Sequence, residues 1–247
     1  MRSFTIIFIL SFSLVQAQEK ERILFIGNSF TFYWNLPNQV EQMSAEKNLE
    51  WDIVQSTEGG ASLRDHWQGN KNLKTKELLT ENTFDRIIFQ DHSNFPLVHI
   101  DTTTYYFNKL KSLIPPKTKI YLYSTWMYPN IEGRENYPNL DDPIERNLRE
   151  KVAAEGDQLI RVGAAFSLFS KRYPEIDLYT DDDKHPSPQG SYLAACVFFS
   201  SLSKKSSKGL KRRYSKTDLN GKKVFYSMVE NKTALKCQEI ADLIVFD

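Results

Sequence analysis

The sequence has 247 residues, of which 40% are hydrophobic and 26% are charged. That apolar content is enough for one sizeable core, and the length predicts one domain or at most two. The 32 Lys and Arg residues nearly balance the 31 Asp and Glu residues, so charge gives no reason to expect nucleic acid as a partner. The two cysteines are too few for a disulfide scaffold or a four-cysteine zinc site.

The first 17 residues, MRSFTIIFILSFSLVQA, have the pattern of a secretory signal peptide. Arg2 supplies the positive charge, an uncharged apolar run follows, and the small residue Ala17 stands at the expected cleavage site. About 12 apolar residues are too few to cross a bilayer core roughly 30 Å thick. We therefore expect an exported protein, periplasmic or extracellular, with a signal peptide at 1–17 and a single domain at 18–247.

Two features of the mature chain leave alternatives open. Cys196 and Cys237 could pair in an oxidising compartment, or Cys196 could be a small buried apolar residue within AACVFF. The segment 204–216, with seven Lys or Arg in thirteen residues, is typical of a solvated loop after a helix, with contact to an anionic surface as the alternative. No other apolar run approaches the roughly 18 residues of a membrane span, so no stable membrane insertion is expected.

Short apolar segments alternate with segments of helical pattern along the mature chain. The expected strands are 21–27, 51–54, 85–90, 119–124 and 159–162. The expected helices are 36–48, a polar stretch reaching about residue 80, 103–113, 143–155 with Asp142 as its N-cap, 188–202 and 234–245. This order predicts an α/β fold of three layers, α/β/α, around a mainly parallel sheet of about five strands.

Three residues could form a nucleophile, a base and a supporting acid. Ser29 follows the first strand within GNSFT, residues 27–31, and active sites of parallel sheets gather at the carboxyl ends of the strands. A serine nucleophile needs a base that a carboxylate orients. His185 and Asp182, three residues apart, fit these two roles. Taken singly, each motif also fits an ordinary turn, because serines and acidic residues are common there.

An oxyanion hole would complete this chemistry. The Gly60 N–H, after the second strand, and the Asn94 amide, after the third, are candidate donors beside the N–H of Ser29. Gln90 or Ser93 could supply the third donor instead of Asn94. Singly, Gly60 is typical of a turn and Asn94 of a loop.

Together, these blocks resemble the SGNH hydrolase superfamily, also called GDSL esterases. The resemblance covers nearly the whole mature chain: a serine block at 27–31, a glycine block at 60–62, an asparagine block at 92–95 and Asp-x-x-His at 182–185. The first block usually reads Gly-Asp-Ser; Asn28 here replaces the aspartate, as in a secreted bacterial subgroup without a settled substrate. The third block lacks the flanking Gly and Asp of the family pattern. The resemblance implies a flavodoxin-like SGNH hydrolase fold and ester hydrolysis by Ser29, His185 and Asp182, without metal or organic cofactor.

Several aromatic residues fall just after the expected strands: Trp34, Trp67, Trp126 and Tyr128. They could line a substrate cleft or pack under loops. Trp126 is the strongest candidate for a substrate wall because it directly follows the fourth strand, and Gln90 is a second candidate for substrate binding. The histidines and the acidic run 181–183 match no metal-ligand spacing, so no metal site is expected.

Two functions follow from these patterns. The first is a secreted serine esterase acting on a small-molecule or glycan ester, most simply by removing O-acetyl groups from carbohydrates. The second, motivated by Asn28 and the altered asparagine block, is an inactive glycan-binding or surface protein with the same fold. The sequence indicates neither the acyl group nor the oligomeric state.

Overall fold

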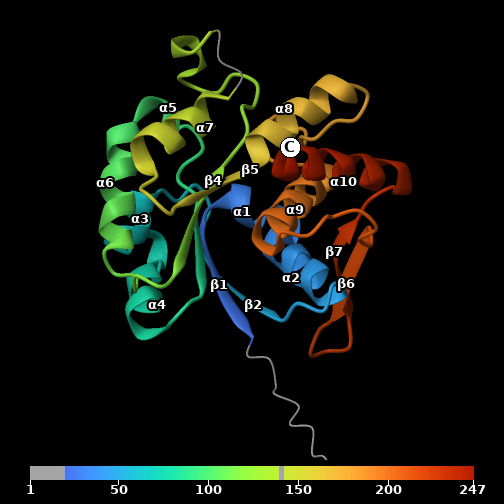
Figure 1. Ribbon diagram of the computed structural model, residues 1–247, viewed down its shortest axis with the longest axis horizontal. Helices are drawn as coiled ribbons and strands as arrows, with labels where there is room; N and C mark the ends of the chain where they lie inside the picture. The colour runs from blue at the N-terminus through green and yellow to red at the C-terminus, as the bar shows by residue number, and fades with distance from the viewer. Residues whose placement is uncertain (1–19, 139–141) are drawn as a thin grey trace, which may run out of the picture.

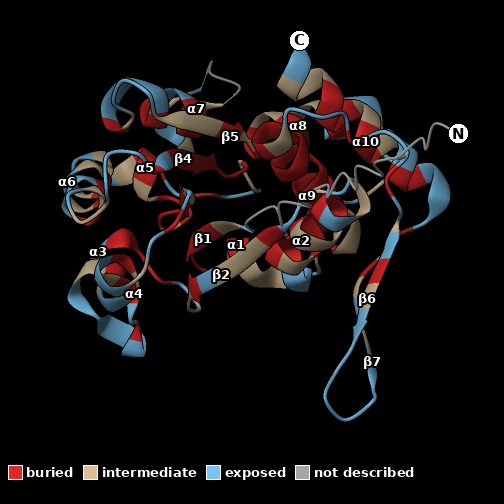
Figure 2. Ribbon diagram, turned by 60° about the horizontal axis from the view of Figure 1, so that its bottom comes forward, coloured by how far each residue is buried: buried red, intermediate tan, exposed pale blue. Residues whose placement is uncertain are grey.

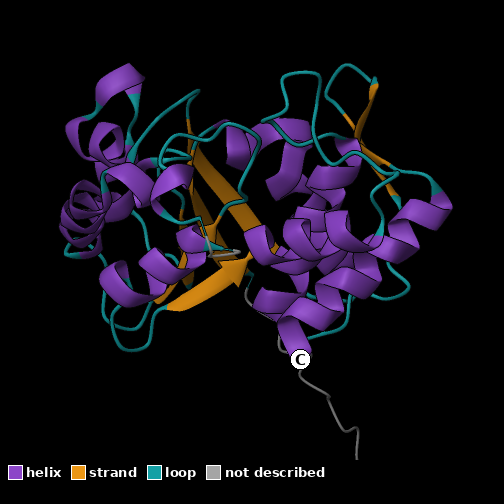
Figure 3. Ribbon diagram, turned by 90° about the horizontal axis from the view of Figure 1, so that it is seen from above, coloured by secondary structure: helices purple, strands orange, loops and turns teal. Residues whose placement is uncertain are grey.

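The computed structural model describes residues 20–138 and 142–247, so the expected signal peptide at 1–17 lies outside the described residues. A five-stranded parallel sheet stands between two layers of helices (Figures 1 and 3). The strand order is β2-β1-β3-β4-β5. The predicted α/β class and three-layer arrangement are confirmed.

All five predicted strands are present in the sheet. They are β1 (Glu21–Gly27), β2 (Trp51–Thr57), β3 (Arg86–Phe89), β4 (Lys119–Ser124) and β5 (Gln158–Arg161). Helices cover both faces of the sheet, so β1 has a nearly continuous apolar run; its last five residues are all buried. The strand β2 continues three residues beyond the predicted end at residue 54, paired with β1 up to Gly27.

One face of the sheet packs against four helices (Figure 1). They are α2 (Leu36–Glu46), α8 (Val162–Arg172), α9 (Pro188–Ser203) and α10 (Asn231–Phe246). The most buried is α9, whose residues from Gly190 to Leu202 are all buried. It is buried on every side because the sheet lies on one flank and α2, α8 and α10 lie on the others.

Shorter helices cover the opposite face. They are α3 (Leu63–Gln68), α4 (Thr75–Glu81), α5 (Phe95–Val98), α6 (Ile100–Lys111) and α7 (Pro143–Asn147), which continues as a π-helical turn at Leu148–Val152. Asp142 caps α7 as predicted, its Oδ1 accepting a hydrogen bond of 2.9 Å from the Glu145 N–H. Three short 3₁₀ turns, Tyr33–Asn35, Asn70–Asn72 and Arg134–Asn136, complete the helical segments.

Among the elements that were not predicted, the two largest are a helix and a hairpin. The helix α8 begins at Val162, directly after β5 ends at Arg161, so no turn residue separates strand from helix in the sequence. The second is an antiparallel hairpin of β6 (Arg213–Thr217) and β7 (Lys223–Met228), which projects from the body with much of its length exposed (Figure 2). Its first strand includes the end of the basic segment expected to be loop, because Tyr214 is buried and anchors it.

Cys196 and Cys237 are buried free thiols. Burial raises the pKa of both thiols above the ordinary value. Within the described part of the chain, none of the helices combines the length and the apolar character that crossing a bilayer requires.

Candidate active site

The site lies where the carboxyl ends of β1 and β3 meet. The connection after β1 leads to β2 on one side, and the connection after β3 leads to β4 on the other; ligands of open α/β sheets bind at such a switch point. Ser29 opens the short helix α1 (Ser29–Phe32), directly after Gly27 and Asn28. Gly27 is required, since an added Cβ would lie 2.6 Å from Oε1 of Gln90.

The structure brings together Ser29, His185 and Asp182. The Nε2 of His185 lies 2.9 Å from Oγ of Ser29, and its Nδ1 lies 2.5 Å from Oδ2 of Asp182. The other carboxylate oxygen, Oδ1, accepts the backbone N–H of His185 at 2.9 Å and the Thr180 hydroxyl at 2.8 Å. The predicted Asp-x-x-His segment therefore folds back on itself and aims the imidazole at the serine.

The electrostatics of this segment favour an ionised acid. Desolvation of Asp182 opposes ionisation, but its hydrogen bonds from His185, Thr180 and Lys184 outweigh that effect and hold the pKa of the carboxyl well below its usual range. An ionised Asp182 accepts the Nδ1–H of His185, which leaves the Nε2 lone pair facing the Ser29 hydroxyl. This tautomer is the one that a general base for serine needs.

Aromatic rings fix the plane of His185. The ring of Tyr33 stacks on the imidazole, with centroids 4.2 Å apart and an angle of 12° between the planes. The ring of Phe30 is tilted against the imidazole, with centroids 5.6 Å apart. The indole N–H of Trp34 donates to the carbonyl of Pro186 at 2.7 Å. The residues just after the nucleophile therefore hold the base.

Two backbone N–H groups near the nucleophile are free to bind an anion. Ser29 is the first residue of α1, where helical N–H groups have no acceptor within the helix. Gly60 turns the chain after β2 with a φ of +60°, and the turn is closed by a 3.1 Å bond from Ala61 N–H to the Glu58 carbonyl. Among the described residues, no acceptor binds the Gly60 N–H.

Asn28 ties the glycine turn to the nucleophile. Its amide donates to the carbonyl of Ala61 at 2.8 Å and to that of Asp91 at 3.3 Å. Its Oδ1 accepts the Phe30 N–H at 3.1 Å. An aspartate could not make the first two bonds, because an ionised carboxylate has no hydrogen to donate. The asparagine that departs from the family pattern thus connects three loops, a role that only tertiary contacts reveal.

Asn94 and Gln90 lie at the end of β3 with their side chains in use. Asn94 donates an amide hydrogen to Glu132 at 2.8 Å, and its oxygen faces Nδ1 of His92 at 2.7 Å. Gln90 is 1% exposed, and its oxygen accepts the Asn28 N–H at 2.8 Å and the Thr31 hydroxyl at 2.9 Å. Its amide donates to the Asp91 carbonyl. The expectation that Gln90 contacts the substrate is therefore corrected: its side chain is buried and bonded to Asn28 and Thr31, on either side of the nucleophile.

The fold of this chain is similar to that of several solved structures. A DUF4886 family protein from Bacteroides uniformis ATCC 8492 matches with a TM-score of 0.69 and 18% identity, over 92% of this chain and 96% of that one. A protein from Slackia heliotrinireducens, named as a candidate SGNH hydrolase, matches with a TM-score of 0.61 and 25% identity, over 74% of this chain and all of that one. The chain has the SGNH hydrolase fold.

A third similar structure is that of a carbohydrate esterase family 3 protein from Talaromyces cellulolyticus. It matches with a TM-score of 0.56 and 14% identity, over 74% of this chain and 97% of that one. No family model matches the sequence, and no curated protein is significantly similar to it.

Trp126 was expected to form a wall of the substrate site, but the structure buries it. It is 1% exposed and stacks between Phe30 at 4.6 Å and Phe166 at 4.2 Å. Its indole N–H donates to the Lys184 carbonyl at 3.0 Å. Trp126 therefore joins the residue after the nucleophile to the loop that carries His185, a supporting role.

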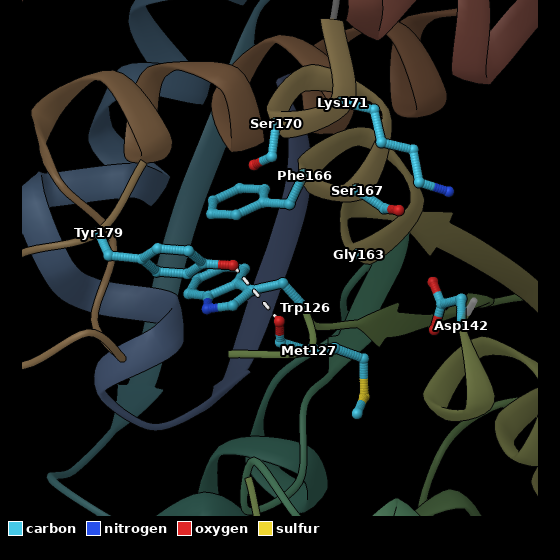
Figure 4. Close-up of a pocket in the computed structure, with 9 residues that line it drawn as sticks. All are labelled: Trp126, Met127, Asp142, Gly163, Phe166, Ser167, Ser170, Lys171 and Tyr179. Carbon is cyan, nitrogen blue, oxygen red and sulfur yellow. Dashed lines mark hydrogen bonds between the residues drawn. The ribbon is translucent and has the colours of Figure 1, made fainter. Parts of the chain in front are cut away.

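Behind Trp126 lies a pocket of about 310 Å³, shown in Figure 4. Phe166, Ser167, Ser170 and Lys171 of α8 form one side, and the Tyr179 hydroxyl donates across it to the Met127 carbonyl at 3.4 Å. Neither Ser29 nor His185 lines this pocket, so it does not border the nucleophile or the base.

Among residues 20–138 and 142–247, no group of three or more His, Cys, Asp or Glu side chains could hold a metal ion. His66, one of the residues examined for ligand spacing, is fully buried. Its Nε2–H donates to the Gly27 carbonyl at 3.1 Å, and its Nδ1 accepts the Thr75 hydroxyl at 2.7 Å. Burial lowers the pKa of His66 to about 4, so this neutral imidazole supports the residue two positions before the nucleophile.

Proposed function

We propose that this chain is a serine esterase that hydrolyses carboxylic esters with Ser29, His185 and Asp182. The observation that carries the proposal is the continuous hydrogen-bonded line from Asp182 through His185 to the Ser29 hydroxyl. Ser29 and His185 are 156 residues apart along the chain, whereas Asp182 and His185 are 3 residues apart. Their assembly in the tautomer that activates a serine supports catalysis over a purely structural role.

In the first half of the reaction, Ser29 Oγ attacks the ester carbonyl while His185 Nε2 takes its proton. The resulting imidazolium is stabilised by the ionised Asp182. The tetrahedral intermediate collapses when His185 returns the proton to the leaving alcohol, which gives an acyl-serine. In the second half, water attacks this acyl group with His185 again as base, and the carboxylic acid leaves.

The oxyanion of each intermediate needs donors that are already in place. We assign two of them to the N–H groups of Ser29 and Gly60, which lack protein acceptors in the described chain. Asn94 gives one amide hydrogen to Glu132, and an amide has two. We assign the second hydrogen of Asn94 as the third donor.

Within this activity, the substrate class we propose is an O-acetylated carbohydrate. The support is the export expected from residues 1–17, which would place the protein where glycans are met, and the balanced charge of the chain. The absence of a long apolar run after residue 17 disfavours a triacylglycerol lipase, which commonly exposes a large apolar surface.

The direct test is hydrolysis of a short-chain aryl acetate by residues 18–247, beside Ser29→Ala. Loss of a triad nucleophile typically removes a factor of about 10⁴ or more in rate, so Ser29→Ala should fall to background. The matched control is Ser112→Ala, an exposed serine at the end of α6, which should keep the wild-type rate. Equal rates for wild type and Ser29→Ala would reject the assignment.

A further inference from the structure

An exposed tryptophan stands beside the proposed triad. Trp34 is 46% exposed, whereas Trp51 and Trp126 are 6% and 1% exposed. A single exposed aromatic residue is ordinary on a protein surface and by itself indicates nothing. The backbone that carries Trp34 and its contacts are what set it apart.

The backbone of this turn is strained. Trp34 has φ 50° and ψ 34°, and Asn35 has φ 54° and ψ 40°. Two consecutive non-glycine residues therefore occupy the left-handed region, at a cost of about 1–2 kcal/mol for Trp34 and less for Asn35, because asparagine adopts this conformation more readily. Such strain persists only where the surroundings enforce it, and it clusters at functional sites.

Three hydrogen bonds enforce the turn. The buried Gln39 donates to the Trp34 carbonyl at 2.6 Å, and the Ser191 hydroxyl donates to the Tyr33 carbonyl at 3.2 Å. The indole N–H of Trp34 donates to the Pro186 carbonyl at 2.7 Å. The indole is thus both exposed and fixed, so binding a ligand against it would cost little conformational entropy.

The place of this fixed indole is the rim of the catalytic site. Pro186 follows His185 in the chain, and Tyr33, which precedes Trp34, stacks on the His185 ring at 4.2 Å. Trp34 is therefore anchored one residue from the proposed base.

The chemistry of the exposed Trp34 indole indicates which class of substrate group it could bind. The Trp34 N–H is already used by Pro186, so the indole offers a flat apolar surface and no hydrogen-bond donor. A pyranose ring has an apolar C–H face of matching shape, and its hydroxyls can stay in water around the rim. We propose that Trp34 is the platform on which the sugar ring of an O-acetylated glycoside stacks; this inference rests on the esterase function proposed above.

The test compares two acetates with the same acyl group: triacetylated methyl β-xyloside and ethyl acetate. Aromatic stacking of ordinary strength corresponds to about a tenfold effect. Trp34→Ala should therefore lower the ratio of kcat/KM for the xyloside over kcat/KM for ethyl acetate about tenfold. Trp34→Phe, which keeps an aromatic face but loses the bond to Pro186, should recover most of that ratio. Tyr105→Ala, which removes a 55% exposed ring from α6, is the control that should leave the ratio unchanged.

Other outcomes would overturn the platform. An unchanged ratio in Trp34→Ala, with both rates lowered equally, would mean that Trp34 only positions the loop of His185. A loss confined to ethyl octanoate would mean that the indole contacts the acyl chain instead.

Binding to the Ser29→Ala protein separates this inference from the esterase proposal. Acetylated xylo-oligosaccharide should bind Ser29→Ala about tenfold more tightly than Ser29→Ala/Trp34→Ala. If wild type hydrolyses no ester while this difference persists, the esterase proposal fails and the platform stands. Equal affinities of the two variants would refute the platform, whatever the hydrolysis assay shows.

Discussion

Replacing Asn28 with aspartate tests how the nucleophile and the glycine turn are joined. Asn28 is 2% exposed, and its amide donates to the carbonyls of Ala61 and Asp91. The variant Asn28→Asp keeps the shape of the side chain and its acceptor for the Phe30 N–H. It removes both donors. The Ala61 carbonyl is left without a partner, which costs about 1–3 kcal/mol, whereas the Asp91 carbonyl still accepts the Gln90 amide.

We therefore expect Asn28→Asp to lower the free energy of unfolding by about 1–3 kcal/mol at neutral pH, measured by urea denaturation of residues 18–247. The same variant should lower kcat for an aryl acetate, because the turn that carries Gly60 is no longer held against the nucleophile. Asn38→Asp, on the partly exposed surface of α2, is the matched control and should change both quantities little. A stability within about 0.5 kcal/mol of wild type, together with an unchanged kcat, would refute this reasoning.

Three further predictions follow from the same geometry. Burial lowers the pKa of His66 to about 4 in the folded protein, from an ordinary value of 6.5. Because the unfolded chain binds this proton first as pH falls, the free energy of unfolding should drop by about 3 kcal/mol between pH 6.5 and 4. The urea midpoint of unfolding should fall more steeply across that pH range in wild type than in His66→Gln. Parallel curves for the two proteins would contradict this role of His66. Trp126→Ala should destabilise the protein by about 3–5 kcal/mol, since it empties a stacked, buried site, whereas Trp126→Phe keeps the stacking and should cost less; calorimetry that finds them equal would contradict the stacking role. Asn94→Ala should lower kcat about 10²-fold with little change in KM if its amide is the third oxyanion donor, and wild-type kinetics would show that the backbone donors suffice.

The sheet and the triad could be predicted because their signals are local. Short apolar segments marked all five strands, and β1 and β4 have the predicted bounds. Ser29 directly follows a strand, and Asp182 and His185 are close in sequence. The resemblance of this joint pattern to the SGNH hydrolases predicted that the three residues would meet.

The supporting residues could not be predicted, because their partners are distant in the chain. Trp126 directly follows β4, which predicted a substrate wall, but Phe30, Phe166 and the Lys184 carbonyl bury it. Gln90 lies under the nucleophile for the same reason, as it bonds to residues about 60 positions earlier. The exposed indole of Trp34 depends on a left-handed turn that no glycine in the sequence announces.

The central claim is that Ser29 is a nucleophile activated by His185. The most direct measurement is the intact mass and peptide map of residues 18–247 after exposure to a serine-directed fluorophosphonate, beside Ser29→Ala and His185→Ala. Our account predicts one adduct, located on the peptide that contains Ser29, absent from Ser29→Ala and formed much more slowly by His185→Ala. A wild-type protein that forms no adduct, or forms it on another serine, would contradict the account.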